Sequence, residues 1–99
     1  MSAEVHIEVA RDGAESVMLS VTGEIDLSNV GHFRAALDLD AATLVVDLGG
    51  VTYIDSAGMA ALFDRARRGR LEVRCQASSV VSPLIDITRL CDVAVIRRD

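Results

Sequence analysis

The sequence predicts an α/β fold in which a mixed, mostly parallel sheet is packed by helices. Short apolar segments typical of strands alternate along the chain with segments whose apolar residues recur at helical spacing. The segments between the later strands are long enough to hold a helix, as parallel pairing requires, whereas the first two strands can form a hairpin. With 99 residues, the chain is expected to form a single domain over residues 1–99.

The first part of the chain predicts a hairpin followed by a helix. Apolar and polar residues alternate over residues 5–9 and 17–22, and residues 11–13 between them are typical of a turn. Gly23 breaks the second strand. Residues 26–29 then offer several helix-capping side chains, and they precede apolar residues at helical spacing, namely Val30, Phe33 and Leu37.

The middle of the chain predicts a central strand and a second helix. Residues 44–48 are mostly apolar, which favours a strand covered by helices on both faces, and Gly49 and Gly50 are expected to end it. The second helix is expected to begin near Ser56 and to end before Gly69, because an apolar stripe with helical spacing runs through Met59, Leu62, Phe63 and Ala66.

The last part predicts a strand, a helix and a closing strand. Residues 71–75 alternate as a strand does, and residues 93–96 form a short apolar run. The helix between them is expected from Pro83 to about Arg89, with Ser82 as its cap, because proline is tolerated at the first helical position. The predicted order of elements is therefore β-β-α-β-α-β-α-β.

Composition excludes several classes of protein. The chain is 51% hydrophobic and 25% charged, values typical of a folded globular domain rather than a disordered one. No stretch approaches the roughly 18 apolar residues of a membrane-spanning helix. Residues 1–6 lack the basic and apolar regions of a secretory signal, so we expect a cytoplasmic protein without membrane insertion.

Cysteine and charge content narrow the choice further. Cys75 and Cys91 form no C-x-x-C pair, and both are expected to be free, buried thiols. The formal net charge is −5, with ten arginines and no lysine. An acidic chain without a coherent basic face is not expected to bind nucleic acid directly. The arginine cluster over residues 65–70 is typical of a solvated helix end.

Ser56 follows a predicted strand and opens a predicted helix, which is the position of an activated nucleophile in some enzymes. A nucleophile elbow needs glycine two positions before the serine, and Ile54 stands there instead. The two histidines, His6 and His32, are not expected to converge on Ser56 as a general base, and surface or partly buried positions suit them better. Hydrolase activity is therefore disfavoured.

Clustered carboxylates would indicate a second kind of site, a metal site or an acid–base site. Glu24, Asp26, Asp47 and Asp55 could gather at the strand ends and bind a divalent cation or act as acid and base. Helix capping explains Asp26 and Asp55 singly, and we favour that role for both. Phosphate-binding glycine loops are absent from the sequence, so no nucleotide site and no cofactor are expected.

The remaining segment carries a family resemblance. Residues 55–58 read D-S-A-G, they follow the predicted strand at residues 44–48, and G-E-I-D stands upstream at residues 23–26. This combination resembles the STAS domain of bacterial anti-sigma factor antagonists, from about residue 5 to residue 96. The G-E-I-D segment and the D-S-A-G segment at this spacing are together fairly specific, whereas D-S-A-G alone is weak.

The resemblance implies a phosphorylation switch in transcription regulation. It implies that Ser56 is phosphorylated by a partner that is both an anti-sigma factor and a serine kinase, and that a phosphatase restores the serine. In such partner switching the unphosphorylated protein binds the anti-sigma factor, and the protein is not an enzyme. By position in the motifs, we expect the partner-binding residues to be Asp26, Asp55, Ser56, Ala57, Gly58 and Met59.

The resemblance leaves one alternative open. Domains of this family also serve as scaffold subunits of sensory complexes or of lipid-transport systems, in which the equivalent serine is unused. The fold would then be the same, and the phosphorylation switch at Ser56 would be absent.

The chemistry at Ser56 suits a switch. A serine at the start of a helix is a cap by default, and a phosphate there adds roughly −1.5 to −2 charges beside backbone N–H groups, so the fold is expected to survive. Beside Asp55 and Asp26, the added charge would repel an acidic partner and would have to be desolvated against an apolar one. Binding is thus expected to be lost without unfolding.

Three neighbouring residues have competing explanations. Gly58 is either a tolerated helix glycine or a small residue that lets a loop approach the Ser56 hydroxyl closely. Met59 is expected in the core by its spacing, although an exposed methionine there would suit a docking surface. Tyr53 is expected to pack against the sheet rather than to act.

Overall fold

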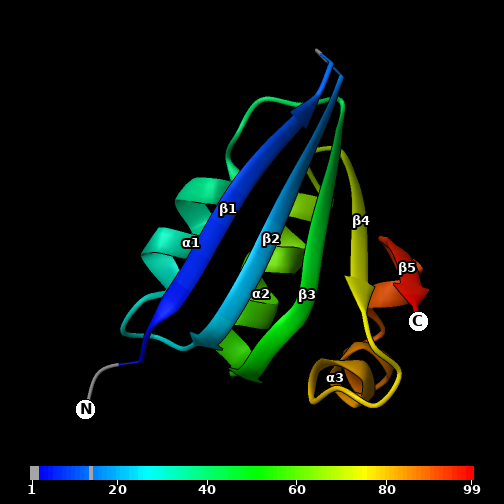
Figure 1. Cartoon of the computed structure of the whole chain (residues 1–99). Helices are drawn as coiled ribbons and strands as arrows, with labels where there is room; N and C mark the ends of the chain where they lie inside the picture. The colour runs from blue at the N-terminus through cyan, green and yellow to red at the C-terminus, as the bar shows by residue number, and fades with distance from the viewer. Residues whose placement is uncertain (1–2, 14) are drawn as a thin grey trace.

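The computed structural model describes residues 3–13 and 15–99 and confirms the predicted fold class and order of elements. A five-stranded sheet has the strand order β1-β2-β3-β4-β5 (Figure 1). Strands β1 and β2 are antiparallel, and the three later pairs are parallel. The elements are β1 (Val5–Asp12), β2 (Ser16–Ile25), α1 (Val30–Leu37), β3 (Thr43–Ile54), α2 (Ser56–Ala66), β4 (Arg70–Cys75), α3 (Val81–Thr88), the 3₁₀ helix η1 (Leu90–Asp92) and β5 (Val95–Arg98).

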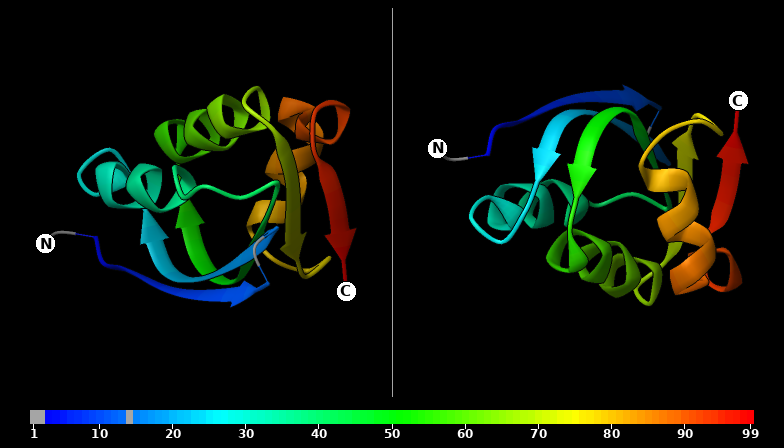
Figure 2. Two further views of the ribbon diagram at one scale, coloured as in Figure 1. Left: turned by 90° about the horizontal axis from the view of Figure 1, so that it is seen from above. Right: turned by 90° about the horizontal axis from the view of Figure 1, so that it is seen from below.

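The core lies between one face of the sheet and the helices (Figures 1 and 2). Alternate residues of β2 from Val17 to Val21 are buried there, and the apolar side chains of the helices meet them, as the periodicity of the sequence predicts. The buried residues of this cluster with no measurable exposure include Val17, Leu19, Phe33, Leu44, Leu62 and Ile85. Helices α1 and α2 lie side by side behind the sheet, and α3 lies at the end where β3 and β4 finish.

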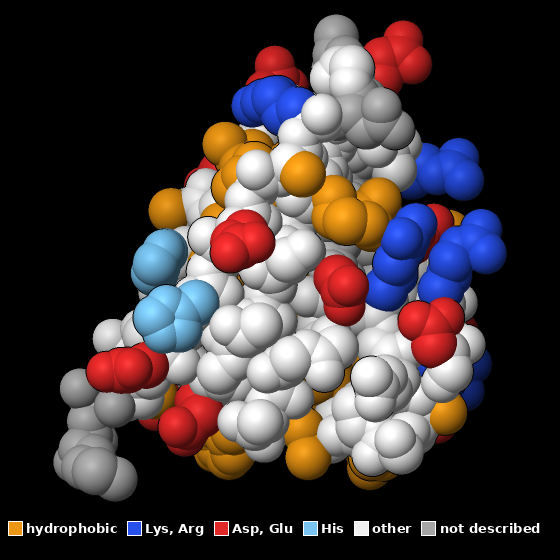
Figure 3. All heavy atoms as spheres, in the orientation of Figure 1, with side chains coloured by type: hydrophobic (Ala, Val, Ile, Leu, Met, Phe, Trp, Pro, Cys, Tyr) orange, Lys and Arg blue, Asp and Glu red, His pale blue; other side chains and the backbone are white. Residues whose placement is uncertain are grey.

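Two expectations for β3 were wrong. The strand does not end at Gly49 and Gly50 but continues through them to Ile54. Its pairing with β2 shifts register twice along this stretch, and a side chain at Gly50 would lie 2.5 Å from Thr22 Cγ2, so glycine permits the close strand approach. The helices cover one face only. The other face carries side chains of both charges among polar ones (Figure 3).

The last third of the chain corrects three further expectations. Helix α3 begins at Val81, two residues before Pro83, and Ser82 lies buried inside it instead of capping it. There it accepts a hydrogen bond from Arg98 Nε at 2.9 Å. The closing strand begins at Val95, because η1 occupies Leu90–Asp92. Cys75 is buried as expected, but Cys91 is exposed; both thiols are free.

Most arginines pair with acidic side chains over the surface. Seven ion pairs join arginines to acids within the described residues, for example Arg34 with Asp64 at 2.8 Å and Arg98 with Asp86 at 2.7 Å. In residues 3–13 and 15–99 no helix has the length and apolar character needed to span a membrane.

Candidate functional site

Ser56 is the first residue of α2, at the point where β3 leaves the sheet. Its side chain is exposed and its hydroxyl makes no hydrogen bond with the described residues. The predicted capping role of Ser56 was wrong, because Asp55 is the cap. The carboxylate Oδ1 of Asp55 accepts hydrogen bonds from the N–H groups of Ala57 at 2.9 Å and Gly58 at 3.1 Å. Ser56 therefore has a free hydroxyl in a fixed backbone position.

Asp55 also joins two segments that are distant in the sequence. Its second oxygen, Oδ2, accepts a hydrogen bond from the N–H of Leu27 at 3.1 Å, while its own N–H donates to the carbonyl oxygen of Ile25 at 3.2 Å. One carboxylate thus fixes both the start of α2 and the loop between β2 and α1. The predicted helix-capping role of Asp55 is confirmed, and its link to Leu27 brings the two motifs together.

Asp26 does not cap a helix, contrary to expectation. Its Oδ1 accepts hydrogen bonds from the N–H of Ser28 at 2.8 Å and from the Ser28 hydroxyl, which forms a local turn. The Ser28 hydroxyl bond is the main reason why the pKa of Asp26 lies below its usual value. Asn29 holds the loop from the other side, since its amide nitrogen donates to the carbonyl of Glu24 at 2.8 Å. Asp26 is therefore held as an anion in the loop that Asp55 contacts through Leu27.

A shallow hollow lies on the β2 side of Ser56, and we call it the acidic hollow. Its volume is about 450 Å³, and it is lined by Asp26, Leu27, Ser28, Tyr53 and Asp55. Leu27 is 78% exposed and Tyr53 is 50% exposed, so two large apolar side chains face solvent between the carboxylates. The expectation that Tyr53 packs against the sheet was wrong, because the register shift near Gly23 turns both Thr52 and Tyr53 outward.

A second hollow lies on the other side of Ser56, between α2 and α3. This apolar groove has a volume of about 450 Å³. It is lined by Ile54, Asp55, Ser56, Met59, Ala60, Phe63, Leu84 and Thr88. Neither hollow has an arginine among its lining residues. Asp55 lines both hollows and so forms the ridge between them, and Ser56, the next residue, lines the apolar groove.

The three residues after Ser56 differ in what they expose. Ala57 is partly exposed, whereas Gly58 is buried and Met59 is only 5% exposed. A side chain at Gly58 would lie 2.6 Å from Ile54 Cγ1 and 2.9 Å from Ile25 Cγ2, so this glycine is needed for packing toward the core and not for an approach from outside. Met59 contributes to the floor of the apolar groove.

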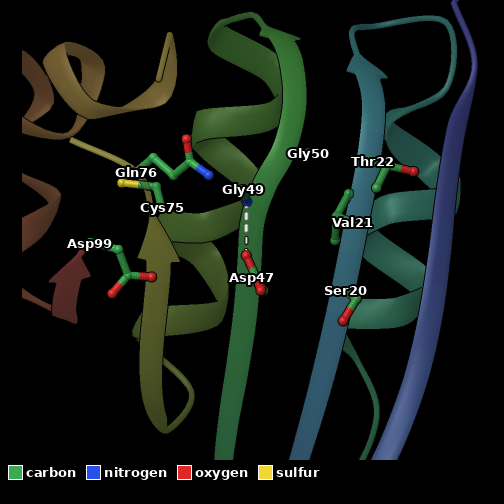
Figure 4. Close-up of a pocket in the computed structure, with 9 residues that line it drawn as sticks. All are labelled: Ser20, Val21, Thr22, Asp47, Gly49, Gly50, Cys75, Gln76 and Asp99. Carbon is green, nitrogen blue, oxygen red and sulfur yellow. Dashed lines mark hydrogen bonds between the residues drawn. The ribbon is translucent and has the colours of Figure 1, made fainter. Parts of the chain in front are cut away.

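The four acids considered as one cluster lie in two places. Asp47 lies on the open face of the sheet, in a groove of about 220 Å³ that it shares with Ser20, Thr22 and Gln76 (Figure 4). There its Oδ1 accepts the N–H of Gly49 at 2.8 Å. Within residues 3–13 and 15–99, no group of three metal-binding side chains comes together. His6 and His32 are both exposed, and neither contacts Ser56 through a hydrogen bond in this part of the chain.

Part of this site has no signal in the sequence. Leu84 and Thr88 reach the groove because α3 packs beside α2, an arrangement set by tertiary packing. Leu27 is an apolar residue in a polar loop, and Tyr53 is an apolar residue just before the motif. Such positions are exposed more often than core positions are, so the exposure of both side chains could have been suspected. The sequence did identify Asp26, Asp55 and Ser56, which the fold places together.

Replacing Asp55 by alanine is expected to lower the free energy of unfolding by about 2 kcal/mol. The change removes the cap of α2 and leaves the N–H of Leu27 without its partner. Urea unfolding measures the loss, and hydrogen exchange at Leu27 should accelerate. Asp47→Ala is the control, because Asp47 accepts a single bond, from Gly49; an equal loss in both variants would refute the linking role of Asp55.

Comparison with known proteins supports the family assignment. A family model described as "Mlab, STAS domain" matches residues 7–94. An anti-sigma factor antagonist from Mycobacterium paratuberculosis has a similar fold, with a TM-score of 0.85 at 20% identity over 97% of this chain and 87% of that chain. No curated protein matches the chain by sequence.

Two structures of SpoIIAA also share the fold. The anti-sigma factor antagonist SpoIIAA in its unphosphorylated form gives a TM-score of 0.75 at 17% identity, over 95% of this chain and 90% of that chain. The Bacillus cell fate determinant SpoIIAA in its phosphorylated form gives 0.70 at 17% identity, over 95% and 93%. Since the family model spans residues 7–94 and the sheet and helices follow the same fold, the chain belongs to the STAS domain family.

Proposed function

We propose that this protein is an anti-sigma factor antagonist that binds an anti-sigma factor serine kinase and is switched off by phosphorylation of Ser56. The observation that carries this proposal is the position of the Ser56 hydroxyl, which is exposed, has no hydrogen bond with the described residues, and lies beside the apolar groove next to Asp55. A kinase can reach such an oxygen without unfolding the chain. The similarity to antagonists of known structure supports the same function.

The two hollows provide the partner surface. The apolar groove would accept an apolar side chain of the anti-sigma factor, and the exposed Leu27 and Tyr53 would add contact area on the other side of the ridge. Asp26 and Asp55 would contact polar or basic groups of the partner. Ala57 would lie at the contact directly, whereas Gly58 and Met59 would act by shaping the surface from beneath.

A phosphate on Ser56 would act mainly through desolvation. The N–H groups of Ala57 and Gly58 are already bonded to Asp55, so the start of α2 offers the phosphate little compensation. No arginine lines either hollow to neutralise it. A partner that fills the apolar groove would strip water from an uncompensated dianion, which is costly. The phosphorylated protein would therefore release the anti-sigma factor, and a serine phosphatase would restore binding.

The direct test is phosphorylation by the cognate kinase in the presence of ATP. We expect one phosphate per chain, located at Ser56 by mass spectrometry, and none in Ser56→Ala. Ser28→Ala is the matched control, because Ser28 is a second exposed serine that lies in the acidic hollow. Labelling that persists in Ser56→Ala, or that disappears in Ser28→Ala, would contradict the proposal. The proposed function includes a cytoplasmic location and a regulatory, non-enzymatic role.

The apolar groove also suits a constitutive partner. In that case the domain would be a scaffold subunit of a sensory complex or a lipid-transport system, and the groove would be used without the switch. Capture of partners with Ser56→Ala and Ser56→Asp distinguishes the two functions. Equal capture by both variants would favour the scaffold.

A further inference from the structure

A buried arginine at the other end of α2 lacks a partner. Arg65 is only 5% exposed, and its Nη1 atom is buried without a hydrogen bond. None of the seven ion pairs within the described residues includes it. A buried guanidinium without an acceptor is unusual, because buried charges are normally paired. This side chain therefore needs an acceptor that the described chain does not provide.

Arg65 lines a hollow that is distinct from the two beside Ser56. The hollow has a volume of about 350 Å³, and its other walls are residues 37–41, between α1 and β3, and Arg68. Arg65 lies nine positions after Ser56 in α2, which is about 14 Å along the helix axis. The fold thus places a polar cavity at the opposite end of the same helix.

The surroundings of Arg65 carry an excess of positive charge. Arginines 34, 65, 67, 68 and 70 gather around this end, against Asp38, Asp40 and Asp64. Arg68 pairs with Asp38 at 2.5 Å, and Asp64 is shared by Arg34 and Arg67. Burial lowers the pKa of Arg65, the charge of Arg68 lowers it further, and Asp38 opposes both. Asp38 and Asp64 therefore have direct arginine partners, whereas Arg65 feels the charge of Asp38 without forming an ion pair with it among the described residues.

We propose that this hollow is an oxyanion site, in which a carboxylate or phosphate group bridges Arg65 and Arg68. The planar guanidinium group delocalises its charge, so an anion that bonds to Arg65 from the hollow compensates the charge of the whole group. Bidentate bonding by arginine suits both carboxylates and phosphates. Arg68 lies half exposed on a flexible side chain and can exchange Asp38 for the ligand. Asp38 and Asp40 also line the hollow and would repel an anion, so a bound anion has to contact both arginines to offset this repulsion.

The test is a titration of the ¹⁵N-labelled full chain with inorganic phosphate, and separately with acetate, each at constant ionic strength against chloride. We expect saturable amide shifts over residues 37–41 and 65–69 with at least one of the two anions. A response to phosphate alone would identify a phosphate site, and a response to acetate alone a carboxylate site. The thermal midpoint should rise with the same concentration dependence.

Variants separate this site from general salt effects. Arg65→Met should fold, because an apolar side chain suits the buried position, and it should lose the saturable shifts. Arg67→Met is the matched control, since Arg67 is exposed on the same turn of chain and does not line the hollow; it should retain them. Arg65→Lys keeps the charge without the planar group and should weaken the response several-fold.

Three outcomes would overturn the proposal: shifts that grow linearly as in chloride, shifts that persist in Arg65→Met, or shifts confined to the start of α2 at Ser56–Gly58. The proposal does not depend on the switch, because Ser56→Asp should leave the anion response unchanged.

Discussion

Replacing Ser56 by aspartate is expected to weaken binding of the anti-sigma factor at least about 100-fold, which corresponds to about 2.8 kcal/mol. The new carboxylate would stand beside the apolar groove and next to Asp55, whose charge is already committed to the helix start. Binding would bury this charge without a counter-ion. The fold should persist, because the side chain of Ser56 is exposed and Asp55 continues to cap the helix.

Calorimetry with the purified partner, together with circular dichroism of the free variant, measures both halves of this prediction. Ser56→Ala should bind as the wild type does, since the Ser56 hydroxyl has no bond to lose within the described chain. Ala42→Asp adds the same charge at an exposed position between α1 and β3, at the far end of α2, and should leave binding unchanged. Unfolding of Ser56→Asp would show that the residue is structural.

The salt dependence of this loss distinguishes its two physical causes. Repulsion between exposed charges is screened strongly at 1 M salt, where the Debye length is about 3 Å. The cost of removing water from a charge against the apolar groove is not screened in this way. Because the groove borders Ser56 directly, we expect binding by Ser56→Asp to stay weak at high salt. Recovery to the wild-type affinity would assign the switch to repulsion by a partner acid.

The local part of the site could be predicted from the sequence because its signals are local. The start of α2 follows from the apolar stripe and from the polar residues before it, and Asp55 can cap only the helix that follows it. The bond from Leu27 to Asp55 has no such signal, since it joins residues 28 positions apart. It depends on parallel pairing of β2 and β3, which brings Ile25 beside Ile54.

The errors have equally specific causes. Gly49 and Gly50 were interpreted as a strand end because glycine usually breaks strands, yet here β2 approaches so closely that only glycine fits at residue 50. Ser82 and Pro83 have the local pattern of a helix start, but Ser82 is buried inside the helix. There its hydroxyl accepts a hydrogen bond from Arg98, a residue 16 positions away. Tertiary contacts overrode local preference in both cases.

The conformation of Gly23 connects the sheet to the loop that Asp55 holds. Its φ is +101°, a value that residues with a side chain rarely adopt. A Cβ atom there would lie 2.3 Å from the carbonyl oxygen of Glu4, which accepts the N–H of Glu24 at 2.8 Å. The same residue falls at a register shift between β2 and β3. The turn of the backbone at Gly23 therefore sets the path of Glu24–Asp26 toward Asp55.

Replacing Gly23 by alanine is accordingly expected to lower the free energy of unfolding by about 3 kcal/mol, from backbone strain and the clash with Glu4 together. In a domain of this size the thermal midpoint should fall by more than about 10 °C. Gly13→Ala is the matched control. Gly13 has a φ of +75° but open space around it, so the substitution adds backbone strain without a clash and is expected to lower the free energy of unfolding by only about 1 kcal/mol. Equal losses of stability in the two variants would mean that the contact with Glu4 relaxes freely. The position of Asp26 would then be set by Asn29 and not by Gly23.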